Sequence, residues 1–177
     1  MLEIDGLELM GENVKSKLKS CGENVTIYPM AKIAFPHTVE IAANAKVRDF
    51  AFIFAGEGVT IGEYSDIQPH TVIWGGGKTI IGDRVSTGPG TVFLSQTYSH
   101  KTPGRKMVDG MGDEQSEILG GVLEIGNDVY IGANSTIMPV KIGEGCVIGA
   151  GSFVGKDCEP WGIYIGSPAK RVGERER

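Results

Sequence analysis

Branched apolar residues recur along most of this chain at a spacing of six residues. They also mark a longer period of twenty, carried by Ile41, Ile61 and Ile81, and within that period Ile67 and Ile73 follow Ile61. An α-helix repeats its apolar stripe every 3.6 residues, so this spacing does not predict helices. It predicts very short strands separated by turns, with three strands in each period of twenty.

A small or medium-sized residue stands four positions after nearly every one of these apolar residues, and a glycine often follows the apolar residue directly. The positions are Ala31, Ala45, Ala51, Ser65, Thr71, Gly77, Val85, Thr91, Val129, Ser135, Cys146, Ser152 and Cys158. Glycine, asparagine and aspartate tolerate the backbone angles of sharp turns. We therefore expect three strands to form one coil around a narrow interior, and the coils to stack by parallel pairing into a solenoid. The alternative is an antiparallel sheet protein with glycine turns, which would show less regular strand lengths.

The repeat is interrupted after Phe93. The next coil would begin near residue 101, but it begins at Leu123. The inserted segment, 95–122, contains charged residues, glycines and Pro103, which together predict a projecting loop. His100 is expected at the root of this loop, where the coil would hold an exposed imidazole in place. A neutral imidazole near pH 7 is the usual general base for an attacking nucleophile.

The composition limits the classes of function. The chain has 177 residues, of which 41% are hydrophobic and 22% charged, as in ordinary globular proteins, but its 27 glycines are about twice the average usage. The net charge of −5 argues against nucleic acid as the main partner. The first residues contain neither a basic start nor a long apolar run, and the three cysteines show no metal-like pairing. These features predict a cytoplasmic protein.

The repeats IGANST, IGEGCV and IGAGSF, followed by YIGSPAKRV, resemble those of the hexapeptide-repeat acyltransferases. The part from 123–172 is similar to the end of the maltose and galactoside O-acetyltransferases and of related sugar acetyltransferases. The resemblance implies a left-handed parallel β-helix over 25–172, preceded by a short segment at 1–24 and followed by a polar tail at 173–177. It also implies a homotrimer with active sites between neighbouring subunits, and acetyl-CoA as the donor.

The resemblance extends to individual residues of an acceptor site. The sequence TYSH aligns with the segment before the catalytic histidine of the sugar O-acetyltransferases, which implies that His100 is the general base of a direct transfer. Gln68 aligns with an asparagine that contacts the acceptor in the galactoside enzymes, and His70 lies next to it in IQPHTV. Trp74 is a further candidate for acceptor binding, although a tryptophan suits a subunit interface equally well.

A second set of residues corresponds to the CoA site of the family. Ala133 and Ala150 match small residues that let the pantetheine arm approach the backbone, and Gly155 and Lys156 match a pair further along the groove. Lys170, in GSPAKRV, matches a basic residue at the nucleotide end, where the phosphates of CoA need a cation.

The sequence does not identify the acceptor molecule. The longer helical N-terminal segment of the maltose and galactoside enzymes has no counterpart here, which favours a sugar of a polysaccharide pathway or a nucleotide-linked amino sugar, acylated on oxygen or nitrogen. Two other functions remain: a non-catalytic scaffold, and a metal enzyme like the γ-class carbonic anhydrases. The second needs three histidines around zinc. His37, His70 and His100 lack the paired spacing of that family, so we expect no bound metal.

Overall fold

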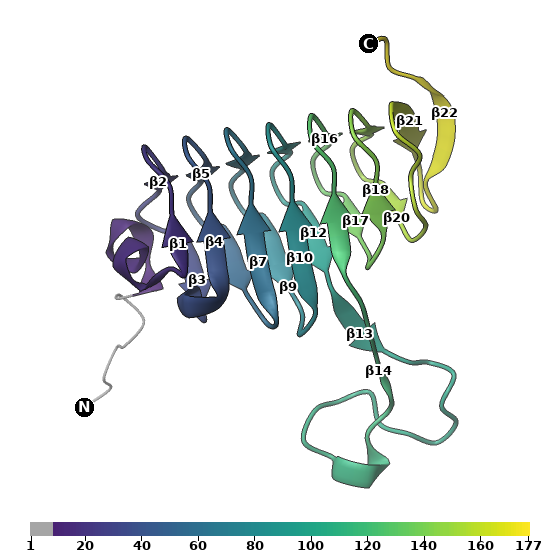
Figure 1. Ribbon diagram of the computed structural model, residues 1–177. Coiled ribbons are helices and arrows are strands. Elements are labelled where there is room, and N and C mark those ends of the chain that lie inside the picture. The colour runs from purple at the N-terminus through teal and green to yellow at the C-terminus, as the bar shows by residue number, and fades with distance from the viewer. Residues whose placement is uncertain (1–8) are drawn as a thin grey trace, which may run out of the picture.

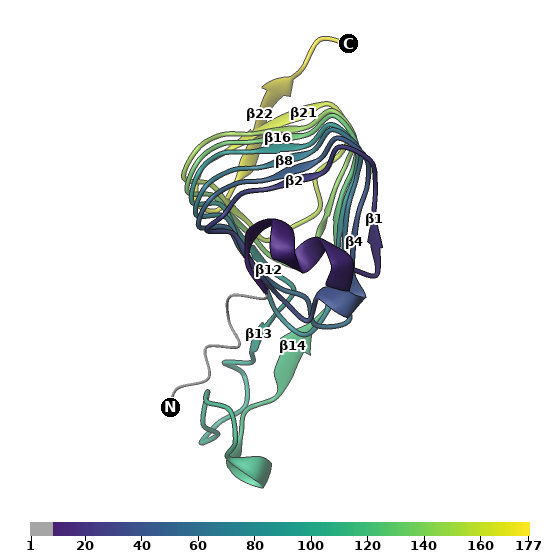
Figure 2. The same cartoon turned by 90° about the vertical axis from the view of Figure 1, so that its left-hand side faces the viewer.

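The computed structural model describes residues 9–177, which form a parallel β-helix (Figures 1 and 2). Its coils stack on one another, and the strands of successive coils form three sheets, one on each face of the helix. The first sheet contains β1 (Ser20–Cys21), β4 (Val39–Ile41), β7 (Gly58–Ile61), β10 (Lys78–Ile81), β15 (Leu123–Ile125) and β18 (Lys141–Ile142). The second contains β2 (Thr26–Ile27), β5 (Lys46–Val47), β8 (Asp66–Ile67), β11 (Ser86–Thr87), β16 (Tyr130–Ile131), β19 (Val147–Ile148), β21 (Gly162–Ile165) and β22 (Lys170–Glu174). The third contains β3 (Lys32–Ala34), β6 (Phe52–Phe54), β9 (Val72–Trp74), β12 (Val92–Leu94), β17 (Thr136–Ile137) and β20 (Phe153–Val154).

The register of the sheets confirms the period of twenty. Ile41 pairs with Ile61, and Ile61 pairs with Ile81, each in parallel. Ile81 then pairs with Ile125, so the interruption is looped out and the stack of coils continues without a gap. The architecture agrees with the left-handed β-helix that the family resemblance implies.

The interior of the coils is filled by the residues that the repeat predicts. The recurring isoleucines are at most 1% exposed, as is Phe93. Polar residues at the small positions satisfy their hydroxyl groups locally: Thr71 and Thr87 share a hydrogen bond of 3.1 Å, and Ser65 donates to the carbonyl of Gly82 at 2.7 Å. Short hydroxyl side chains thus fit a narrow apolar core because each one finds a backbone or hydroxyl partner.

The inserted segment forms a two-stranded antiparallel ribbon that projects from the edge of the β-helix (Figure 1). Its strands are β13 (Gln96–Tyr98) and β14 (Ile118–Gly120), and a single turn of 3₁₀-helix, η4 (Gly112–Glu114), lies in the loop beyond them. We call the whole of 95–122 the hairpin. The expected projecting loop is therefore confirmed, and it has regular structure near its base.

Both ends of the β-helix are covered. The 3₁₀-helix η2 (Gly11–Lys17) lies over the first coil (Figure 2), and a second short one, η3 (Pro36–Thr38), follows β3. The first strand begins at Ser20, five residues before the expected start, whereas part of the expected N-terminal segment lies outside the described residues. At the other end β22 folds back antiparallel on β21, and Arg175 donates to the carbonyl of Asp128 at 2.8 Å. The charged C-terminus is therefore engaged with the last coils. Among residues 9–177, no helix is long and apolar enough to cross a membrane.

Candidate active site

His100 lies on the hairpin, two residues past the end of β13. The backbone just before it is held by neighbours: the Ser99 amide donates to the Glu117 carbonyl at 2.7 Å, and the Ser116 hydroxyl donates to the Ser99 carbonyl. The His100 side chain itself is exposed and has no partner within residues 9–177. The sequence placed it at the root of the loop, but the structure places it at the far end of the ribbon, so the ribbon and not the coil positions the imidazole.

The base of the ribbon is held tightly against the coil at the glycines that follow Trp74. The Ser95 amide donates to the Trp74 carbonyl at 2.9 Å, and the Gly76 amide donates to Oε1 of Gln96 at 2.7 Å. A Cβ atom added at Gly75 would lie 2.3 Å from the Ser95 hydroxyl, and Gly75 has a φ of +132°. Glycine is needed here because the hairpin and the coil approach more closely than any side chain allows.

A groove of about 580 Å³ lies between this ribbon and the end of the third sheet. Its lining residues are Phe54, Trp74, Gly75, Gly76, Leu94, Gln96, Thr97, Tyr98, Asp109 and Ile118. Trp74 packs on Phe54 with ring centroids 4.7 Å apart, yet the residue remains 44% exposed. Trp74 therefore presents part of its indole to the groove, which agrees with either of its two expected roles.

Four of the residues expected to bind ligands lie at a different edge, the corner between the second and third sheets: Gln68, His70, Ala133 and Ala150. The backbones of His70, Gly90, Asn134 and Gly151 stack there, each amide donating to the coil before it, and Ala133 and Ala150 precede the last two. The ring of His70 stacks on Phe50 with centroids 5.0 Å apart and planes 6° from parallel. Gln68 is half-buried two residues before His70, and its backbone N–H donates to the hydroxyl of Thr87 at 3.0 Å.

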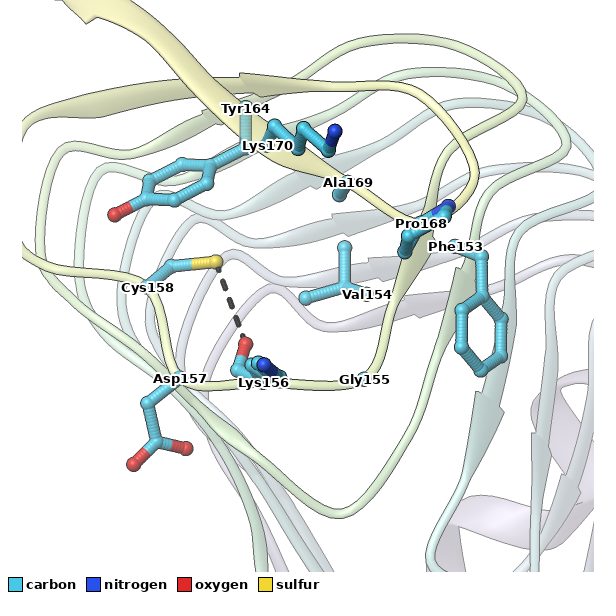
Figure 3. A pocket seen from close by; sticks show the side chains of 10 residues that line it. All are labelled: Phe153, Val154, Gly155, Lys156, Asp157, Cys158, Tyr164, Pro168, Ala169 and Lys170. Carbon is cyan, nitrogen blue, oxygen red and sulfur yellow. Dashed lines mark hydrogen bonds between the residues drawn. The ribbon is translucent and has the colours of Figure 1, made fainter.

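The remaining three expected CoA-binding residues, Gly155, Lys156 and Lys170, meet in a pocket of about 270 Å³ at the C-terminal end of the β-helix (Figure 3). Its other lining residues are Phe153, Val154, Asp157, Cys158, Tyr164, Pro168 and Ala169. Burial raises the pKa of the Cys158 thiol to about 12, so this sulfur is neutral at physiological pH. The pocket thus combines an apolar floor with two exposed lysines at its rim.

Within one subunit, these groups do not converge. His70 and Trp74 occupy opposite ends of β9, and Ala150 and Gly155 flank β20 in the same way. His100 stands apart on the hairpin. The sequence also did not single out Gln96, Tyr98 and Asp109 of the groove or Tyr164 of the C-terminal pocket. Only their positions in the sequence could have identified them as site residues: the first three belong to the inserted segment, and Tyr164 lies in the YIGSPAKRV motif.

Among the described residues, no three side chains of His, Cys, Asp or Glu lie close enough together to hold a metal ion. His37 is exposed in η3, His70 lies at the corner between the second and third sheets, and His100 is on the hairpin. The three histidines therefore lie in three different parts of the chain and do not converge on one point.

Comparison with known proteins gives a consistent result. A family model described as the hexapeptide repeat of succinyl-transferase matches residues 122–156. A dTDP-4-amino-4,6-dideoxy-D-glucose acyltransferase of Escherichia coli is 34% identical over 163 residues, which cover 90% of this chain and 83% of that protein. A probable macrolide acetyltransferase of Lysinibacillus sphaericus is 38% identical over 124 residues, or 63% of this chain and 68% of that one.

Solved structures extend the similarity. AntD, an N-acyltransferase from Bacillus cereus in complex with dTDP and 3-hydroxybutyryl-CoA, superposes with a TM-score of 0.85 at 30% identity, over 92% of this chain and 86% of AntD. A hexapeptide-repeat acetyltransferase of Vibrio cholerae complexed with acetyl-CoA has a TM-score of 0.68 at 23% identity over 93% and 75% of the two chains, which shows a common fold. The repeats, the three-sheet coil and the nearly full-length relatives together show that this chain is an acyltransferase of the hexapeptide-repeat family.

Proposed function

We propose that this enzyme transfers an acyl group from acyl-CoA to the amino group of a nucleotide-linked amino sugar. The observation that carries the proposal is the similarity over 90% of the chain to an acyltransferase named for a dTDP-linked 4-amino sugar, because it includes the hairpin and not only the repeats. AntD, which is similar over 92% of the chain and is an N-acyltransferase, supports nitrogen as the acylated atom.

The donor site in this proposal comprises the C-terminal pocket and the corner that carries Ala133 and Ala150. Lys156 and Lys170 supply positive charge for the phosphates of CoA. At the corner the residues stacked with Ala133 and Ala150 include Gly90 and Gly151, so the pantetheine arm meets few bulky side chains and can approach backbone amides.

His100 acts as the general base in this proposal. The protonated amino group of the acceptor first loses one proton to solvent water. The neutral amine nitrogen then attacks the thioester carbonyl carbon, and the bond between this carbon and sulfur breaks. The proton lost by the nitrogen passes to the imidazole and then to the departing thiolate, which leaves as free CoA. No acyl-enzyme is required, and an exposed imidazole without a partner in its own chain is free to meet a substrate.

The site is completed in a homotrimer, since one chain holds the imidazole and the donor-binding residues apart. The outer face of the third sheet is the surface we assign to subunit contact. Its first row of outward side chains, Lys32, Phe52, Val72, Val92, Thr136 and Phe153, is apolar except for Lys32 and Thr136, and this row is the one we expect a neighbouring subunit to cover. The second row, Ala34, Phe54, Trp74 and Leu94, borders the groove at the base of the hairpin. A continuous apolar face of this kind marks an interaction surface on a water-soluble protein.

The experiment is a thiol-release assay with acetyl-CoA and dTDP-4-amino-4,6-dideoxyglucose, run beside its 4-hydroxy analogue. The wild type should release CoA with the amino sugar, and His100→Ala should lower turnover by about 100-fold while binding acetyl-CoA normally. His37→Ala, another exposed histidine, is the matched control and should stay within twofold. Turnover with the hydroxyl sugar alone would reject nitrogen as the acceptor, and normal turnover of His100→Ala would remove His100 from the mechanism.

A further inference from the structure

The groove beneath the hairpin has one wall suited to an apolar sugar face. Phe54, Trp74 and Leu94 come from the third sheet, and Ile118 comes from the ribbon. Trp74 is oriented by its contacts with Phe52 and Phe54, at centroid distances of 5.9 Å and 4.7 Å. An indole that is held by neighbours but is 44% exposed offers a pre-formed surface for a ring lacking polar groups on one side.

The opposite wall supplies polar groups. Gln96 accepts a hydrogen bond from the Gly76 amide through Oε1, so its NH₂ group remains as a donor. Tyr98 follows two residues later on the same ribbon, and both side chains line the groove. Asp109 closes it from the loop beyond the ribbon, where one of its carboxylate oxygens accepts from the Gly110 amide at 2.9 Å. The second oxygen is available to a ligand.

The charge of the groove discriminates between ligand groups. Among the described residues that line the groove, Asp109 is the only acidic one, and none is a lysine or an arginine. A pyrophosphate would meet no cation there and would face a carboxylate. A sugar that carries an ammonium group and lacks hydroxyls on one face would match both the charge and the aromatic wall.

We propose that this groove binds the amino-sugar part of the acceptor, with Trp74 stacking on its apolar face and the Asp109 carboxylate recognising its ammonium group. The inference rests on the proposed function and assigns its acceptor specificity to three residues outside the repeats: Gln96, Tyr98 and Asp109. Gln96, Tyr98 and His100 follow one another at intervals of two residues. The base thus lies on the same arm of the hairpin as Gln96 and Tyr98.

Binding can be measured without turnover, because the chain has only two tryptophans. In a Trp161→Phe background, Trp74 is the sole indole, and its emission should change on titration with dTDP-4-amino-4,6-dideoxyglucose. Asp109→Asn in that background should weaken binding of the amino sugar by about tenfold and leave binding of the 4-hydroxy analogue within twofold. Asp113→Asn, a carboxylate on the same loop outside the groove, should change neither value.

The result separates the groove from the proposed function. If the wild type turns over but Asp109→Asn binds both sugars as the parent does, the groove assignment is wrong while the reaction stands. The assignment of the groove holds if Trp74 emission responds to the amino sugar and Asp109→Asn loses the preference for the amino sugar over its 4-hydroxy analogue. It would hold even if the enzyme acylated a different atom of the sugar. Equal weakening for both sugars would overturn recognition of the ammonium group.

Discussion

At the scale of single residues, the interior of the coil selects side chains by size. Isoleucine at one position and a small residue four positions later fill a space that one coil shares with the next, and Cys146 and Cys158 occupy two of the small positions. Both cysteines are at most 4% exposed. Burial raises the pKa of each of these thiols, since the charged thiolate would lose its hydration. Both cysteines contribute to the packing of the coil interior.

This shift makes a prediction about alkaline stability. The folded pKa of Cys158, about 12, lies above its ordinary value of 9.0. A raised pKa contributes stability that is complete below pH 9 and is lost as the pH rises toward 12, because only the unfolded chain ionises in that window. Urea unfolding at pH 8 and pH 10.5 should show that the wild type loses more free energy of unfolding than Cys158→Ala, by on the order of 1 kcal/mol. Equal losses in the two proteins would contradict the burial of this thiol.

At the scale of elements, the position of the hairpin depends on the glycines that follow Trp74 and contact its base. Gly77 faces the point where the chain returns from the hairpin: a Cβ atom there would lie 2.5 Å from the Gly121 carbonyl oxygen and 3.0 Å from that of Ser95. These are backbone atoms, so the hairpin would have to shift. Since His100 is held by the ribbon and not by the coil, a shift at the base is passed on to the imidazole.

We therefore expect Gly77→Ala to lower kcat by about tenfold and to leave the KM for acyl-CoA unchanged, because the proposed donor site is built on other coils. The control is Gly120→Ala on β14, where an added Cβ atom has only ordinary contacts of 3.4 Å or more. Steady-state kinetics on both variants would test this. A proportional rise in the KM for acyl-CoA would show that the coil itself, and not the hairpin, had been disturbed.

At the scale of the whole molecule, the three faces of the β-helix differ in character. The outer face of the first sheet carries charged pairs, such as Lys141 with Glu124 at 2.9 Å, and the second carries Arg48 with Asp66 at 2.6 Å. The outward side chains of the third sheet are mostly aromatic and aliphatic, with Lys32 and Thr136 as the polar exceptions. Only this last face would be stabilised by leaving water, which is the basis for assigning it to trimer contact.

A charge at the centre of that face should prevent assembly. Val92→Glu on β12 would bury a carboxylate in the proposed contact. The molar mass measured by light scattering coupled to size-exclusion chromatography should therefore fall from that of a trimer toward that of the single chain, 18.9 kDa. Val147→Glu, an outward valine on β19 of the second sheet, is the matched control and should stay trimeric. Dissociation by the control alone would place the contact on the second sheet.

The sequence by itself determined the coil and the family. The isoleucine spacing, the small position four residues later and the gap between Phe93 and Leu123 predicted three strands per coil, parallel stacking and a projecting insertion, and all of these are confirmed. The expectation of an acyl-CoA donor agrees with the CoA-bound relatives. These features were readable because each coil contacts only its neighbours, so a short-range pattern in the chain becomes a short-range pattern in space.

Only the tertiary structure decided where the chemical groups lie. His100, Trp74, Lys156 and Lys170 come from different parts of the chain. Their spacing in the sequence did not predict that His100 lies beyond the ribbon, or that Asp109 and Trp74 line the same groove. The hairpin lies outside the repeat, so its direction depends on contacts such as that of Gln96 with the Gly76 amide, which no periodicity encodes. The repeat fixes the scaffold through its buried positions, whereas the side chains on the exposed edges are not constrained by it, so their arrangement depends on the folded chain.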